Sequence, residues 1–162
     1  MSNDFENIQN NARKYSDKLA ELGKELSEIQ FNFKVINKTE SEYWQKRIED
    51  FKKYHQKGME YYEQVHLLMN LVEKEKAGLF LLSISKLRQL GTKLIELLEK
   101  VKENPTIMSS KDKQQSKWSK ETKEQLIEIS NNNLRHEMEM NTNFRDFYEK
   151  HLMKILEKKD NQ

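Results

Sequence analysis

Apolar side chains near the start of the chain recur at spacings that alternate between three and four. Charged and amide residues fill most of the positions between them. This spacing keeps one face of a helix apolar for more than four heptads, which is typical of a coiled-coil seam. We therefore predict a helix from about residue 3 to residue 36. Its seam residues are Phe5, Ile8, Ala12, Tyr15, Leu19, Leu22, Leu26, Ile29, Phe33 and Ile36.

A second apolar series follows residues 37–41. Thr39 and Glu42 have the spacing of a capping box, in which each side chain satisfies a backbone donor at a helix start. Asn104-Pro105 ends the series, because proline disfavours helix in the residue before it. The pattern predicts a helix over 42–103. Its apolar positions include Trp44, Ile48, Phe51, Tyr62, Val65, Met69, Val72, Ile84, Leu87, Leu90, Leu94, Leu98 and Val101.

The seam of this middle segment shifts near residues 73–78, where there is no apolar anchor. Gly78 weakens a helix there by about 1 kcal/mol. No proline or turn dipeptide marks a break, so we favour one long, bent helix over two helices joined by a tight turn. Both alternatives remain open at the level of sequence.

Residues 104–117 are polar and rich in serine and lysine, and we predict a loop there. A third helix is expected over 119–158, with Leu126, Ile129, Met140, Phe144, Phe147, Leu152 and Ile155 on its seam. Asn133 and His136 fall at interior positions, where a polar residue can fix the register of packed helices. The predicted fold is all-α: long antiparallel coiled-coil helices forming an elongated helical bundle, as a single domain over 1–162.

Leu79-Phe80-Leu81-Leu82 is apolar on every side of the middle helix. One interpretation is that neighbouring helices and a second protomer cover it. The other is an amphipathic segment whose Lys86, Arg88 and Lys93 meet anionic lipid. We predict that interfaces form through these four residues together with Leu19, Leu22, Leu26 and Ile29.

Composition narrows the possible functions. Apolar and charged residues each make up 35% of the chain, which suits helices that bury a narrow stripe. The formal net charge is +2 and no segment is strongly basic, which argues against a nucleic-acid binder. Cysteine is absent, which excludes disulfides. Residues 1–5 lack the apolar core of a secretory signal. Charges interrupt the most apolar stretch, which argues against a transmembrane helix there. We expect an intracellular, cytoplasmic protein, with attachment to a membrane surface as the alternative location.

Motifs for catalysis or metal binding are incomplete. Glu63 and His66 have the Glu-x-x-His spacing of di-iron bundles, but no second pair exists. His136-Glu137 resembles the start of a zinc-protease motif, yet Met140 stands where the second histidine is needed. No glycine-rich phosphate loop is present. We predict no enzymatic activity, no cofactor and no metal.

A basic cluster surrounds Trp118 between the second and third predicted helices. From Lys102 to Lys123, six lysines face three acidic residues. An aromatic side chain among lysines suits contact with lipid headgroups, although a solvated loop is the simpler interpretation. The residues of this predicted membrane tip are Lys111, Lys113, Lys117, Trp118, Lys120 and Lys123.

The C-terminal helix resembles a known family. Glu128-Ile129-Ser130, Leu134-Arg135-His136-Glu137 and Phe144-Arg145-Asp146-Phe147 are similar to the last helix of sorting-nexin BAR domains. The resemblance covers about 30 residues and implies a crescent-shaped dimer that binds curved, anionic membranes through basic surfaces.

Two functions therefore follow from the sequence. We favour a non-enzymatic scaffold or adaptor subunit that acts through helix–helix interfaces in a larger assembly. Its partner would be a second copy of the chain or another helical protein. The alternative is a BAR-like dimer that binds anionic membranes through the basic tip.

Overall fold

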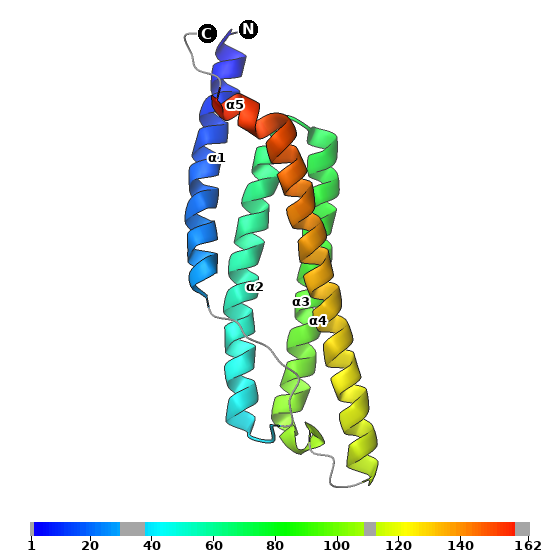
Figure 1. Cartoon of the computed structure of the whole chain (residues 1–162). Helices are drawn as coiled ribbons and strands as arrows, with labels where there is room; N and C mark the ends of the chain where they lie inside the picture. Colours follow the sequence, from blue (N-terminus) through cyan, green and yellow to red (C-terminus); the bar gives the residue numbers. More distant parts are fainter. Residues whose placement is uncertain (1, 30–37, 109–112, 158–162) are drawn as a thin grey trace. The chain divides into compact units, whose positions relative to one another are not determined.

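The computed structural model describes residues 2–29, 38–108 and 113–157 (Figure 1). The side chains of residues 2, 3, 107 and 113–119 lie outside this description. Within the described ranges the chain is helical, with short connections and no strand, and four long helices pack together. The predicted all-helical fold is confirmed. The elements are α1 (Ser2–Glu28), α2 (Ser41–Asn70), α3 (Lys74–Glu103), the 3₁₀ turn η1 (Pro105–Met108), α4 (Lys113–Phe147), the π-helical turn η2 (Tyr148–Leu152) and α5 (Met153–Glu157).

Most of the seam predicted for the first helix lies on its inner face, although Phe5 is exposed. Ala12, Leu19 and Leu22 are buried, while Ile8, Tyr15, Leu26 and Ile29 are half-buried. Helix α1 ends at Glu28, earlier than the predicted residue 36. Phe33 and Ile36 lie outside the described residues.

The middle segment is two helices, so our preference for one bent helix was wrong. The chain turns at residues 71–73, where the N–H groups of Val72 and Glu73 both donate to the Met69 carbonyl, at 3.1 and 2.8 Å. The turn brings the apolar faces of α2 and α3 together: the rings of Tyr62 and Phe80 lie 6.1 Å apart. A single continuous helix would leave both faces in water, and burying them offsets the cost of the turn.

Contacts between Cα atoms divide the chain into two compact units. Unit 1 contains Met1–Glu28, Lys57–Lys86 and His136–Gln162, and unit 2 contains Ile29–Gln56 and Leu87–Arg135. Helices α2, α3 and α4 each contribute residues to both units. The two units are therefore not two consecutive stretches of sequence.

Unit 2 is built on an apolar cluster from α2, α3, η1 and α4. Trp44 is fully buried, and its indole N–H donates to the Lys38 carbonyl at 2.8 Å. Ser41 donates to the Lys102 carbonyl near one end of the α2–α3 pair, while His55 lies against Gly91 further along. The two helices therefore run in opposite directions. The buried cluster consists of Trp44, Ile48, Phe51, Leu94, Leu97, Leu98, Val101, Met108 and Leu126.

The predicted loop over 104–117 is shorter in the structure. Pro105–Met108 forms η1, and α4 already begins at Lys113, before the predicted start at residue 119. Met108 is fully buried in the cluster of unit 2. Burial of this side chain explains why η1 folds back on the helices.

Unit 1 joins α1 to the second half of α2. The Gln64 side-chain amide donates to the Tyr15 carbonyl at 3.3 Å, and the Lys57 ammonium lies 2.6 Å from the Glu25 carboxylate. On the other side, the Tyr62 hydroxyl donates to the Asn141 side-chain oxygen of α4 at 2.8 Å. These contacts fix which face of α2 meets each neighbour.

Candidate functional site

The apolar turn at residues 79–82 lies in unit 1, near the start of α3. Phe80 is 2% exposed and packs inward, whereas Leu79, Leu81 and Leu82 are 61%, 46% and 67% exposed. Leu19 and Leu22, which we also predicted as interface residues, are buried within unit 1, so their contacts are intramolecular. Phe80, also predicted as an interface residue, is likewise buried within unit 1. Of the predicted interface, the three leucines of α3 are the part most accessible to another molecule.

Two of these leucines belong to a short stripe with a charge at each end. Glu75, Leu79, Leu82 and Lys86 follow at spacings of four, three and four, which places them on one face of α3. All four side chains are exposed. Within the described residues, neither Glu75 nor Lys86 has an ion-pair partner. We call these four residues the α3 stripe.

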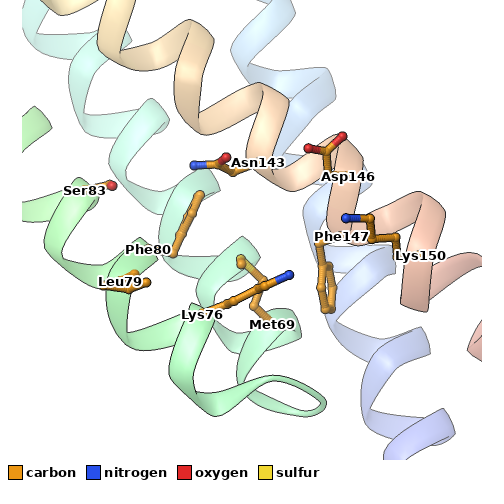
Figure 2. A pocket seen from close by; sticks show the side chains of 9 residues that line it. All are labelled: Met69, Lys76, Leu79, Phe80, Ser83, Asn143, Asp146, Phe147 and Lys150. Atoms are coloured by element: carbon orange, nitrogen blue, oxygen red, sulfur yellow. The ribbon is translucent and has the colours of Figure 1, made fainter.

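A pocket of about 270 Å³ opens beside the stripe, also within unit 1 (Figure 2). Helices α2 and α3 contribute one wall, and the end of α4 with η2 contributes the other. Leu79 is common to the pocket and the stripe. The lining residues are Met69, Lys76, Leu79, Phe80, Ser83, Asn143, Asp146, Phe147 and Lys150.

The turn between α2 and α3 is tied to η2 through Glu73. Its carboxylate lies 3.2 Å from the Lys76 ammonium and also contacts the His151 ring. Partial burial raises the pKa of Glu73, but the hydrogen bond with Lys76 and the charge of His151 outweigh it, so the pKa is lowered. These contacts hold the pocket's neighbouring elements in place.

The interior polar residues predicted on the last helix are buried as expected. Asn133 and His136 are 6% and 8% exposed. The His136 ring makes a 2.8 Å hydrogen bond with the Ser83 carbonyl of α3, so it serves helix packing. His66 likewise lies 2.9 Å from the Ala77 carbonyl, while Glu63, the other residue of the incomplete Glu-x-x-His motif, is exposed.

The residues that the structure describes contain no group of three or more potential metal-binding side chains. In the same part of the chain, each helix is too short or too polar to cross a bilayer.

The basic tip is only partly described. Lys111 lies outside the described residues, and Lys113, Lys117 and Trp118 lie on α4 with side chains that are not described. Lys120 is exposed and Lys123 is half-buried.

Comparison with known proteins provides no relative: no family model, curated protein or solved structure matches this chain. The pocket was not predicted from the sequence. Phe147 was predicted on a seam and Phe80 in the stretch that is apolar on every side, and each has a lysine within four residues, Lys150 and Lys76. A lysine near a buried phenylalanine is common on amphipathic helices. Only the packing of α3 against α4 shows that these residues line one pocket.

Proposed function

We propose that this chain is a non-enzymatic helical scaffold subunit that associates with a second copy of itself through the α3 stripe. The observation that supports this most directly is the 61% and 67% exposure of Leu79 and Leu82. Large apolar side chains grouped on a surface usually mark an interaction site.

The order of residues in the stripe favours a second copy as the partner. In a two-fold symmetric pair of antiparallel α3 helices, Leu79 of each copy would lie opposite Leu82 of the other. The same arrangement places Glu75 of each copy opposite Lys86 of the other. A two-fold interface requires a surface that complements itself in this way, and the order of apolar and charged residues in this stripe meets that requirement.

The expected association is weak. Burying a leucine side chain contributes about 1.5–3 kcal/mol, but association also costs translational and rotational freedom. One helical stripe is small beside the roughly 800 Å² per partner of stable interfaces. We therefore expect a dissociation constant on the order of micromolar. We also propose that the long helices pack as an elongated antiparallel coiled-coil bundle, as predicted from the sequence, which would present one such stripe on each chain.

Charge reversal tests the pairing of Glu75 with Lys86. Glu75→Lys and Lys86→Glu should each abolish the dimer in sedimentation velocity, because each places like charges opposite one another. The double variant should restore it, since the pairs are exchanged but complementary. Lys93→Glu, on the same helix but beyond the stripe, is the matched control and should leave the dimer unchanged.

Circular dichroism of every variant checks that helicity is preserved. A wild-type chain that remains monomeric at about 100 μM would contradict the proposal, given the expected micromolar affinity. So would a double variant that stays monomeric while both single variants are folded.

The membrane-binding alternative is supported by the excess of lysines at residues 102–123 and by the exposure of Lys120. The resemblance of the C-terminal helix to BAR domains supports the same alternative. Cosedimentation with phosphatidylserine vesicles at low and high salt tests it, because exposed charges are screened over about 10 Å at 0.1 M salt. Replacing Lys111, Lys113, Lys117 and Lys120 by glutamate should abolish vesicle binding. A wild-type protein that stays in the supernatant at low salt excludes this alternative and leaves the scaffold proposal intact.

A further inference from the structure

We infer that the pocket between α3 and the end of α4 binds a small amphipathic carboxylate, a molecule with one apolar chain or ring and one anionic group. This inference does not require the proposed dimer, although the pocket and the α3 stripe share Leu79. It follows from the apolar side chains inside the pocket, the charges at its edge, and its size.

The inner surface of the pocket is apolar. Met69, Phe80 and Phe147 line it and are only 2–4% exposed. Leu79 lines it as well and is 61% exposed, so it lies at the opening. An apolar chain or ring entering here would cover a leucine that is otherwise in water. The hydrophobic effect favours that exchange.

The charged groups of the pocket are mainly cationic. Lys76 reaches it from α3, and Lys150 reaches it from η2 (Figure 2). Asp146 is the one acidic residue among the nine that line the pocket. Lys76 also lies 3.2 Å from Glu73, so Lys150 is the cation more available to a ligand. Asn143 adds an amide that can donate a hydrogen bond to a carboxylate.

The π-helical turn supplies Lys150. It begins immediately after Phe147, the last lining residue on α4, and its N–H of Met153 bonds to the carbonyl of Tyr148. Such wide turns are rare and frequently occur at functional sites. Here the turn links the apolar wall of the pocket to its cation.

The volume of about 270 Å³ limits the ligand. At roughly 30 Å³ for each non-hydrogen atom, as for a water molecule in the liquid, it accommodates about nine such atoms. Typical ligand pockets are larger, about 300–1,000 Å³. A medium-chain carboxylate such as octanoate, with about ten non-hydrogen atoms, is close to this size. A longer chain would extend past Leu79 into solvent.

Titration of the full chain with octanoate, followed by NMR, tests the inference. Octanoate should bind saturably at one site, with shifts confined to the lining residues, whereas octanol and octylammonium should bind more weakly. Equal binding of octanol would remove the role assigned to the lysines and would overturn the inference. Octanoate that does not saturate would overturn it as well.

Substitutions at the edge of the pocket should act in opposite directions. Lys150→Gln should weaken octanoate binding about 3- to 10-fold, because it removes a charge that pairs with the carboxylate. Asp146→Asn should strengthen binding by about 2- to 5-fold, because it removes a like charge. Lys154→Gln is the matched control: it makes the same charge change one turn further on, at an exposed residue that does not line the pocket. An equal effect of Lys154→Gln and Lys150→Gln would show general electrostatic attraction only and would overturn the inference.

Leucine substitutions separate this site from the proposed dimer. Leu79→Ser should weaken both octanoate binding and self-association, whereas Leu82→Ser should weaken self-association alone. Lys150→Gln should leave the dimer unchanged. If octanoate binding disappeared at protein concentrations where dimers form, a side chain of the second copy would fill the pocket, and the inference would be wrong.

Discussion

Gly91 of α3 lies against His55 of α2 in unit 2. The imidazole of His55 lies directly on it, so that a Cβ atom at residue 91 would overlap the ring. His55 also stacks on Phe51, with ring centroids 5.4 Å apart and planes inclined by 18°. A glycine inside α3 weakens the helix, but here it allows a flat polar ring to lie between the helices.

The burial of His55 predicts a dependence of stability on pH. Burial lowers the pKa of His55 below its ordinary value of 6.5, and the nearby positive charge of Arg88 lowers it further. The unfolded chain therefore binds the proton more readily, and stability should fall as the pH drops below 6.5 toward the folded-state pKa. Stability contributed by neutral His55 is fully present above this range.

His55→Gln should reduce this loss of stability, because glutamine does not titrate. The measurement is the urea midpoint at about pH 8 and about pH 5 for both proteins. The other three histidines are present in both proteins, so the comparison isolates His55. An identical pH dependence in wild type and variant would contradict the prediction.

Among the elements, η2 depends on the turn between α2 and α3. The contact between the Glu73 carboxylate and the His151 ring joins the two. Further along, the Gln9 side chain of α1 donates to the Ile155 carbonyl of α5 at 3.0 Å. The end of the chain is thus held at two points within unit 1.

Glu73→Gln should loosen η2, because the neutral amide loses the charge that holds His151. We expect amide protection over residues 148–152 to fall several-fold in hydrogen exchange, while protection in the core of α2 stays unchanged. Glu149→Gln is the matched control, since it removes an exposed carboxylate from η2 itself. Equal loss of protection in both variants would assign the effect to charge on η2 instead of the contact with Glu73.

At the scale of the whole molecule, continuous helices connect the two units. Because α2, α3 and α4 each run through both units, we expect the two units to unfold together. Leu22→Ala removes a side chain that is 4% exposed in unit 1 and should cost about 2–5 kcal/mol. Trp44 reports on unit 2, where it is fully buried.

Leu22→Ala is measured in a Trp118→Phe background, so that the fluorescence comes from Trp44 alone. The denaturant midpoint followed by Trp44 fluorescence should then fall as much as the midpoint followed by circular dichroism. That coincidence would show that damage in unit 1 is transmitted to unit 2. A Trp44 transition that stays at the wild-type midpoint, with a biphasic dichroism curve, would show that the units unfold separately.

The sequence alone determined the helical fold and most inward-facing positions. The spacings of seven and three between Ala12, Leu19 and Leu22 placed them on one buried face, because helix geometry is local and repeats along the chain. The interior positions of Asn133 and His136 followed from the same periodicity. The exposed leucines at 79–82 were likewise visible as a turn with more apolar residues than one face can hold.

Only the tertiary structure decided where the chain turns and what its polar groups contact. No glycine or proline occupies residues 71–73, and the turn there is stabilised by the packing of α2 against α3. The packing of α3 against the end of α4 brings Lys76 and Lys150, far apart in the sequence, to one pocket. Periodicity specifies which face of a helix is apolar, but the partner of that face depends on contacts between distant segments, which local spacing does not encode.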